Sequence, residues 1–297
     1  MSALPTLLYF EDEQAAATAL AQAAGLNAAA IERHRFPDGE LKLRLPPALP
    51  ERVVLWRSLA QPNEKLVELM LAAHTARTLG ARHLTLVAPY LAYMRQDMAF
   101  HPGEAISQRV VGGYLASLVD AVVTVDPHLH RVTTLQEAVP VAQSCVISGA
   151  PALSDLIAQQ QPDALLIGPD EESAQWIAQA AQRHGFEHGV CRKQRHGDRN
   201  VSIELPALPV NARAVVLLDD VASSGHTLAQ AARGLLAAGA ATVDVAVTHA
   251  LFASGALELI QAAGVRHIWS TDCIAHATNA VCMAPALADA LKTLNRA

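Results

Sequence analysis

The chain is poor in the features that mark several large classes of protein. Aromatic residues make up 4% of its 297 residues, and its formal net charge is −6. No apolar run reaches the roughly 18 uncharged residues that a membrane-spanning helix needs. The negative balance leaves no overall positive field to attract nucleic acid. We therefore expect no membrane insertion and no nucleic-acid partner.

Cysteine is also scarce. The four cysteines are scattered and form no CxxC pair, which argues against a zinc site or a disulfide framework; they are Cys145, Cys191, Cys273 and Cys282. Cys191 stands beside two basic residues that could lower its pKa, but a buried strand thiol is the other interpretation. The N-terminus, MSALPTLLYFEDE, has no basic region before its short apolar stretch. We expect no signal peptide and a reduced, cytoplasmic protein.

What the chain does contain is an alternation of short apolar runs and alanine-rich helical patterns. Helical patterns cover residues 64–80, 172–185 and 227–240. Strands that alternate with helices and are rich in β-branched residues predict parallel sheets covered on both faces. The predicted strands are residues 6–10, 52–56, 83–90, 121–126, 164–168, 214–220, 242–250 and 267–272.

The alternation runs twice. Its second cycle begins after a stretch with proline and serine near residues 148–154. We predict two α/β domains of similar size, residues 1–145 and 146–297.

One predicted strand ends in an unusual set of polar residues. The stretch 215–228 reads VVLLDDVASSGHTL, in which an apolar run leads into Asp219 and Asp220 and then into hydroxyl residues and a glycine. Ligands of open α/β sheets bind beyond the carboxyl ends of the strands, and a helix N-terminus attracts anions. Helix capping would explain Ser223 or Ser224, but not two acids directly after a buried strand. The stretch predicts a site for ribose hydroxyls on the acids and for a phosphate on the loop.

This loop resembles the phosphoribosyl pyrophosphate motif of the type I phosphoribosyltransferase fold. Further segments, in the same order and over nearly the whole chain, resemble the ribose-phosphate pyrophosphokinase family (phosphoribosyl pyrophosphate synthetases). GEAIS and the Ser-containing loop are more similar to the archaeal type than to the common bacterial one. The segments are FPDGE (36–40), PY (89–90), Tyr93, RQD (95–97), GEAIS (103–107), DPH (126–128) and KQR (193–195).

The resemblance implies a fold, an activity and partners. The fold would be two tandem parallel-sheet domains of the type I phosphoribosyltransferase kind. The activity would be transfer of the pyrophosphoryl group of Mg-ATP to ribose 5-phosphate, which gives phosphoribosyl pyrophosphate and AMP. The N-terminal domain would carry the ATP-site loops, and the C-terminal domain the ribose 5-phosphate site and a catalytic flap. The protein would be a homo-oligomer with Mg²⁺ as its cofactor.

The resemblance also implies roles for single residues. On the flap, Lys193 and Arg195 would stabilise charge on the transferred group. Asp170 would begin the pyrophosphate loop, and the metal contacts would be Asp126, His128 and Asp170. The ATP-binding residues would be Phe36, Asp38, Glu40, Arg95, Gln96, Asp97 and His128, with FPDGE reaching the nucleotide of a neighbouring subunit. The ribose 5-phosphate site would comprise Asp219, Asp220, Ser223, Ser224, Gly225, His226 and Thr227.

The residues alone leave blander interpretations open. FPDGE is typical of a Pro-Gly turn, and CRKQRHGDRN (191–200) of a solvated charged loop. Acids beside Asp170 could simply favour a helix N-terminus. A lone arginine such as Arg95 is often a surface charge, and a single histidine is more often a satisfied polar residue than a ligand.

Some positions depart from the family pattern. Met98 stands where a basic residue is frequent, and His226 where glycine is common. Glu171 and Glu172 replace small residues, and they would repel a polyphosphate unless they point away or hold a cation. These departures keep open a non-catalytic, nucleotide-binding regulatory homologue. A phosphoribosyltransferase would share the DD loop but has no use for FPDGE, RQD and KxR together. The chain has no GxxxxGK[ST] and is not a P-loop kinase.

Overall fold

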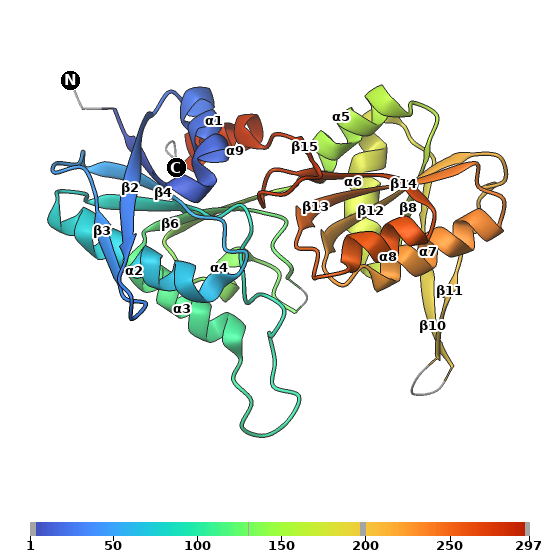
Figure 1. The fold of residues 1–297 in the computed structure, drawn as a ribbon, viewed down its shortest axis with the longest axis horizontal. Helices are drawn as coiled ribbons and strands as arrows, with labels where there is room; N and C mark the ends of the chain where they lie inside the picture. Colours follow the sequence, from blue (N-terminus) through green and yellow to red (C-terminus); the bar gives the residue numbers. More distant parts are fainter. Residues whose placement is uncertain (1–3, 130, 197–199, 295–297) are drawn as a thin grey trace. The chain divides into compact units, whose positions relative to one another are not determined.

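The computed structural model describes residues 4–129, 131–196 and 200–294 (Figure 1). For residues 193–196 and 200–203 it describes the backbone alone. The chain divides into two compact units. Unit 1 comprises Met1–Ile147 and Met283–Ala297, and unit 2 comprises Ser148–Cys282.

Unit 1 is built on a seven-stranded sheet in the order β3-β2-β1-β4-β5-β6-β7. Every neighbouring pair is parallel except the antiparallel β2–β3 hairpin. Its strands are β1 (Thr6–Phe10), β2 (Asn27–Arg35), β3 (Leu41–Arg44), β4 (Arg52–Trp56), β5 (His83–Val87), β6 (Ala121–Val125) and β7 (Gln143–Ile147). Its helices are η1 (Glu11–Glu13), α1 (Gln14–Ala24), α2 (Pro62–Thr78), α3 (Ser107–Leu118), α4 (Leu135–Ala138) and α9 (Ala284–Leu294).

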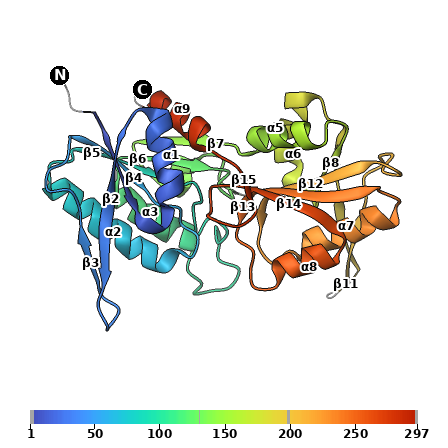
Figure 2. The ribbon, with the colours of Figure 1, turned by 45° about the horizontal axis from the view of Figure 1, so that its top comes forward.

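Helices cover both faces of the unit 1 sheet, which explains its mostly apolar inner strands. α1 packs against α9 on one face, and α2 packs against α3 on the other (Figures 1 and 2). Leu55 of β4 lies in one core cluster with Leu69 of α2 and Leu115 of α3. Because successive strand residues point to opposite faces, the part of a strand that is buried on both sides must be apolar, as TLLYF and RVVLW are after their first residues.

Unit 2 is built on a six-stranded parallel sheet in the order β15-β14-β13-β12-β8-β9, with a separate β10–β11 hairpin. Its strands are β8 (Leu165–Gly168), β9 (His188–Val190), β10 (Arg192–His196), β11 (Asn200–Glu204), β12 (Ala214–Ala222), β13 (Thr242–Ala250), β14 (Val265–Thr271) and β15 (Asn279–Val281). Its helices are α5 (Ala150–Gln160), η2 (Glu171–Ser173), α6 (Ala174–His184), α7 (His226–Ala237) and α8 (Ala256–Ala262).

The central strand β12 shows why unit 2 also has two covered faces. Val215 and Leu217 lie in a core cluster with Leu235 of α7. The alternate residues Val216 and Leu218 lie in a second cluster, with residues of α6. The apolar residues of β12 therefore pack against helices on both faces of the sheet, which keeps the strand at its centre.

These observations confirm the predicted fold class of two parallel-sheet α/β domains. All eight predicted strands are present, with ends shifted by up to three residues. The predicted division near residue 145 lies close to the observed one after Ile147. The C-terminal helix differs from the prediction, because α9 belongs to unit 1, where Leu287 and Leu291 are buried and the helix packs on α1 and β7.

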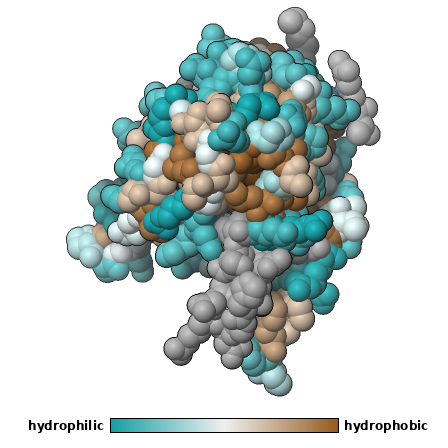
Figure 3. Space-filling view, turned by 90° about the vertical axis from the view of Figure 1, so that its right-hand side faces the viewer, coloured by the Kyte–Doolittle hydropathy of each residue, from teal (hydrophilic) through white to brown (hydrophobic). Residues whose placement is uncertain are grey.

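Within the described ranges, none of the helices combines the length and the apolar character that crossing a membrane requires. Figure 3 shows one face of the molecule, on which hydrophobic residues gather between hydrophilic ones. More than half of the surface of an ordinary folded protein comes from apolar atoms, so this patch by itself identifies no partner.

Candidate active site

The two acids predicted to bind a sugar lie at the carboxyl end of β12, between β8 and β13. The backbone amide of Asp220 donates to Oδ1 of Asp219 at 3.0 Å, and Asp220 is only 3% exposed. Burial, together with the negative charges of Asp220 and Asp170, raises the pKa of Asp219 well above its ordinary value. Crowded carboxylates of this kind are stabilised by hydroxyl donors or a cation.

The loop after these acids has a defined backbone. Residues 223–225 connect β12 to α7, whose first residue is His226. The amide of Phe252 donates to the carbonyl of Ala222, and the amide of Ala253 to the carbonyl of Ser223, each at 2.9 Å. The segment after β13 thus holds this loop in place at the N-terminus of α7. The first turn of a helix leaves N–H groups without intrahelical partners, which suits an anion.

Gly225 is required here for two reasons. Its φ of +76° lies in the left-handed region, and an added Cβ would lie 3.0 Å from the carbonyl oxygen of Ala256. The neighbouring side chains of the loop differ in solvent exposure. Ser223 and Thr227 are partly buried, whereas Ser224 and His226 are exposed.

The contacts of Gly225 predict a specific loss on substitution. Gly225→Ala combines the strain of a left-handed residue, about 1–2 kcal/mol, with a contact against backbone, so both the melting temperature and the affinity for ribose 5-phosphate should fall. Gly255→Ala is the matched control, because Gly255 has φ +80° but open space around the added Cβ. Equal losses in thermal melting and in titration calorimetry for the two variants would contradict the role of the contact.

Asp170 lies near Asp219, whose pKa its charge helps to raise, because it follows β8, the neighbour of β12. Its Oδ1 accepts the amide of Glu172 at 3.1 Å, and its carbonyl accepts the hydroxyl of Ser173 at 2.6 Å. Oε1 of Glu171 lies 3.6 Å from Nε of Arg192, with both side chains largely exposed. One of the two unexpected acids therefore faces a guanidinium of the same unit.

The predicted flap is a β-hairpin made of β10 and β11, in which residue 193 pairs with residue 203 and residue 195 with residue 201. The side chains of Lys193 and Arg195 lie outside the described part of the structure. Cys191, just before the flap, is buried, and burial together with the charge of Asp170 raises its pKa to about 12. Because the thiolate is the nucleophile, a buried unreactive thiol is the interpretation that fits.

In unit 1, the RQD segment follows β5. Arg95 is exposed, and Nε2 of Gln96 donates to the carbonyl of Met98 at 3.0 Å. Asp97 is buried, and its Oδ1 accepts Nη1 of Arg131 at 2.6 Å. The aspartate thus has an ionic partner inside the unit, and no motif in the sequence pointed to Arg131.

Asp126 follows β6, the strand next to β5. It has φ +36°, an uncommon conformation for a residue other than glycine, and is 6% exposed. Its amide donates to the carbonyl of Ile147 at 2.9 Å. Backbone strain of this kind clusters at functional sites, and here it shapes the turn that presents the partly buried His128.

The FPDGE segment is the turn of the β2–β3 hairpin. Oδ1 of Asp38 accepts the amide of Glu40 at 3.1 Å, and Gly39 has φ +93°, so turn chemistry accounts for the middle of the segment. The Phe36 ring is 39% exposed and lies edge-to-face against His34 with centroids 4.8 Å apart. The turn therefore presents an aromatic ring and the exposed carboxylate of Glu40 to solvent.

The predicted site residues thus form groups within each unit. In unit 2, Asp170, the β12 acids and the loop 223–227 share neighbouring strand ends. In unit 1, the RQD and DPH segments share the ends of β5 and β6, while FPDGE lies across β1 and β4 near the other edge.

Among the described residues, no three His, Cys, Asp or Glu side chains gather as a metal cluster. Mg²⁺ in phosphoryl-transfer sites takes one or two carboxylates plus substrate phosphates, a demand that the acids at these strand ends meet.

Family models match both units. Residues 6–118 match the N-terminal domain of ribose phosphate pyrophosphokinase, and residues 144–266 match the phosphoribosyl transferase domain.

Curated relatives and a solved structure agree with these models. A ribose-phosphate pyrophosphokinase from Methanopyrus kandleri is 36% identical over 93% of this chain and 94% of its own length. One from Halobacterium salinarum is 33% identical over 96% of this chain and 100% of its own. The fold matches the crystal structure of phosphoribosylpyrophosphate synthetase from Mycobacterium smegmatis, with a TM-score of 0.82, 21% identity and 99% of each chain covered. The similarity to archaeal relatives confirms the prediction drawn from GEAIS and the Ser-containing loop.

Proposed function

Because the chain belongs to the ribose-phosphate pyrophosphokinase family, we propose that it transfers the pyrophosphoryl group of Mg-ATP to the anomeric hydroxyl of ribose 5-phosphate. The products are phosphoribosyl pyrophosphate and AMP. The observation that carries the proposal is the acid pair Asp219–Asp220 at the centre of the unit 2 sheet, followed at once by a loop that ends in a helix N-terminus.

The ribose 5-phosphate site combines two kinds of binding group. Asp219 and Asp220 accept the ribose hydroxyls, directly or through Mg²⁺, and so orient the anomeric hydroxyl. The loop from Ser223 to Thr227 holds the 5-phosphate through its hydroxyls and the free N–H groups of α7. His226 is exposed at the start of α7, where its ring can donate to the phosphate without filling the loop.

The ATP site draws on unit 1. Arg95 and Gln96 bind phosphate and nucleotide groups, and Asp97 holds their loop through Arg131. Phe36, Asp38 and Glu40 receive the adenine of a neighbouring copy. This arrangement requires a homo-oligomer. The proposed location of the protein is the cytoplasm.

Mg²⁺ is the proposed cofactor. Its proposed contacts are Asp126 and His128 in unit 1 and Asp170 in unit 2, and the substrate phosphates supply further ligands. When bound, it neutralises phosphate charge. The raised pKa of Asp219, caused by burial and by its acidic neighbours, supports a cation at the unit 2 strand ends as well. Arg95 and His128 orient the polyphosphate, which is most of what a protein contributes to phosphoryl transfer.

Lys193 and Arg195 are the proposed catalytic residues. Charge that develops on the transferred group is stabilised by cations placed in advance, and such stabilisation is commonly the largest single catalytic effect. A hairpin backbone supports this role, because it carries both residues away from the sheet on a strand of their own.

Glu171 and Glu172 are expected to have little influence on turnover. Glu171 faces Arg192, and exposed ion pairs contribute only about 0–1 kcal/mol, so Glu171→Gln with Glu172→Gln should change kcat by less than about fivefold. A steady-state assay of AMP formation measures this. A rise of tenfold or more in the double variant would mean that these acids repel the polyphosphate.

Two other functions make different predictions for the same reagents. A regulatory homologue would bind ATP but leave it intact in the presence of ribose 5-phosphate and Mg²⁺. A phosphoribosyltransferase would instead release pyrophosphate from phosphoribosyl pyrophosphate when a nucleobase is added. Formation of AMP from ATP that depends on ribose 5-phosphate, without such pyrophosphate release, supports the synthetase over both.

A further inference from the structure

The hairpin that carries FPDGE extends beyond the sheet that supports it. β1 pairs with β2 only from Thr6–Asn27 to Phe10–Ile31, yet β2 continues to Arg35. From Glu32 to Arg35 it pairs with β3 alone. Figure 2 shows the two strands projecting together at the edge of unit 1. A two-stranded ribbon is only marginally stable by itself, so other contacts must set the direction of its turn.

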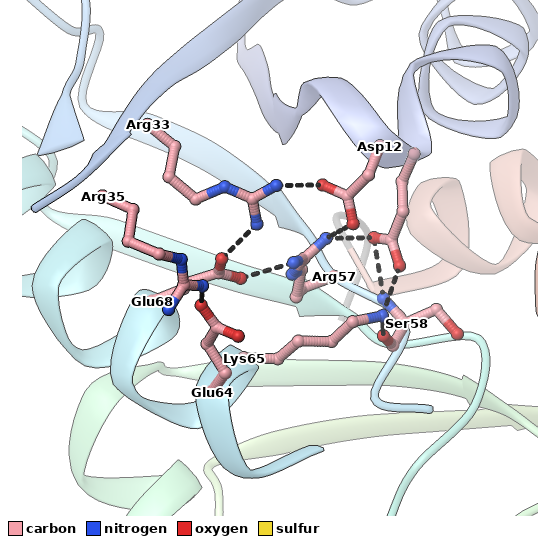
Figure 4. A network of polar contacts seen from close by, with 9 residues as sticks. Asp12, Arg33, Arg35, Arg57, Ser58, Glu64, Lys65 and Glu68 are labelled. Carbon is pink, nitrogen blue, oxygen red and sulfur yellow. Dashed lines mark hydrogen bonds and ion pairs between the residues drawn. The ribbon is translucent and has the colours of Figure 1, made fainter. Parts of the chain in front are cut away.

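Two arginines of this projection reach acids on α2. Arg33 pairs with Glu68, and Arg35 pairs with Glu64 (Figure 4). The two arginines are two residues apart on a strand and so share one side of it. The two acids are four residues apart on a helix and so share one face of it. The result is a two-rung ladder that ties the end of β2 to the first turns of α2.

The inner rung is itself fixed by a closed ring of charges. Arg57, at the end of β4, pairs with Glu68 on one side and with Asp12 at 2.7 Å on the other. Asp12 also lies 3.4 Å from Nη2 of Arg33, which closes the ring. Arg57 is 1% exposed and Glu68 is 0% exposed. The guanidinium carbon of Arg57 lies over the ring of Phe10, 4.6 Å from its centroid.

Burial separates the two halves of this network. Buried charges such as Arg57 and Glu68 must be paired, so the fold needs their contact regardless of the conformation of the β2–β3 hairpin. The side chains of Arg33 and Arg35 are 32% and 51% exposed and could reach solvent without a partner. Fixing these two side chains therefore affects mainly the FPDGE turn, which begins directly after Arg35.

We propose that Arg33 and Arg35, through Glu68 and Glu64, are positioning residues that hold the FPDGE turn in the orientation in which it receives the adenine of ATP. The inference rests on the proposed function, because it takes the assignment of Phe36 and its neighbours to the ATP site as its premise. It requires that loosening the ladder weakens ATP binding and leaves the ribose 5-phosphate site in unit 2 unchanged.

The test compares three arginine variants of the same hairpin. Arg33→Met should raise KM for ATP about tenfold, because a charge-assisted contact is lost, and Arg35→Met by up to about fivefold. In both, kcat and KM for ribose 5-phosphate should stay within about twofold of the parent. Arg44→Met is the matched control, since Arg44 pairs with Glu32 inside the hairpin and both are exposed. It should leave both KM values unchanged.

A charge exchange separates positioning from a general loss of stability. Arg35→Glu alone and Glu64→Arg alone should each raise KM for ATP, and the double variant should restore it. Hydrogen exchange at amides 32–44 gives a readout free of catalysis. Exchange should be faster in Arg33→Met than in the parent and unchanged in Arg44→Met. Should Arg33→Met fail to fold, Arg33→Lys, which keeps the charge but cannot span both Glu68 and Asp12, replaces it.

The outcomes separate this inference from its premise. If the parent protein forms AMP and Phe36→Ala raises KM for ATP, but Arg33→Met and Arg35→Met do not, the ladder has no positioning role. Unchanged amide exchange in Arg33→Met would overturn the inference in the same way. If the parent protein forms no AMP at all, the proposed function fails, and the exchange experiment still decides whether the ladder orders the hairpin.

Discussion

Replacing Lys193 with alanine should lower kcat by about two to three orders of magnitude, the usual cost of removing a group that stabilises charge in the transition state. The affinity for ribose 5-phosphate should change by less than about threefold, because that ligand is held by the β12 acids and the loop before α7. Single-turnover kinetics gives the first quantity and titration calorimetry the second. The split between them identifies a residue that acts in the transition state.

Arg192 provides the control for this prediction. It is the preceding residue of β10 and carries the same charge, but its side chain is exposed and faces Glu171. Arg192→Ala should keep kcat within about fivefold of the parent, as expected for an exposed ion pair. A fall of less than tenfold in Lys193→Ala, or an equal fall in both variants, would remove Lys193 from the catalytic role.

Replacing Asp220 with asparagine should weaken ribose 5-phosphate binding by about 10- to 100-fold. The change keeps the shape of the side chain but removes a charge, and hydrogen bonds to charged groups contribute about 1.5–3 kcal/mol. Burial makes the loss larger, because Asp220 is only 3% exposed and water cannot replace the missing acceptor. Titration calorimetry in the presence of Mg²⁺ measures the affinity.

The matched control for Asp220→Asn is Asp163→Asn. Asp163 is an exposed acid just before β8, at the opposite end of the same sheet, and it contacts Arg213 through its backbone carbonyl only, among the described contacts. This variant should bind ribose 5-phosphate like the parent. Unchanged affinity in Asp220→Asn would show that the sugar is bound elsewhere, and equal weakening in both variants would point to overall charge instead of a site.

The inner strands and the sugar-phosphate loop could be predicted from sequence because their signals are local. After their first residues, TLLYF and RVVLW are continuous apolar runs, and the β12 acids follow such a run directly. β2 escaped prediction because its sequence, NAAAIERHR, has one fully buried residue, Ile31, and no alternation of apolar and polar positions. Its strand form depends on pairing with β1 and β3, which lie elsewhere in the chain.

Other parts of the structure depend on contacts between distant segments. Arg57 would ordinarily be expected at the surface, but acids 45 residues before it and 11 residues after it allow its complete burial. The return of α9 to unit 1 depends on an apolar surface of α1 near the other end of the chain. Similarly, the partner of Asp97 is Arg131, 34 residues away. Nothing in the local sequence indicates which distant segment of the chain each of these residues or helices contacts.

The central claim is tested most directly by ³¹P NMR of the purified protein with ribose 5-phosphate, ATP and Mg²⁺. We predict that AMP resonances appear together with a new diphosphate attached to the sugar, at equal rates. If ATP stays intact while a known synthetase turns over under the same conditions, the chain is not a working synthetase. It would then be a nucleotide-binding homologue that keeps the fold and the acid pair without the reaction.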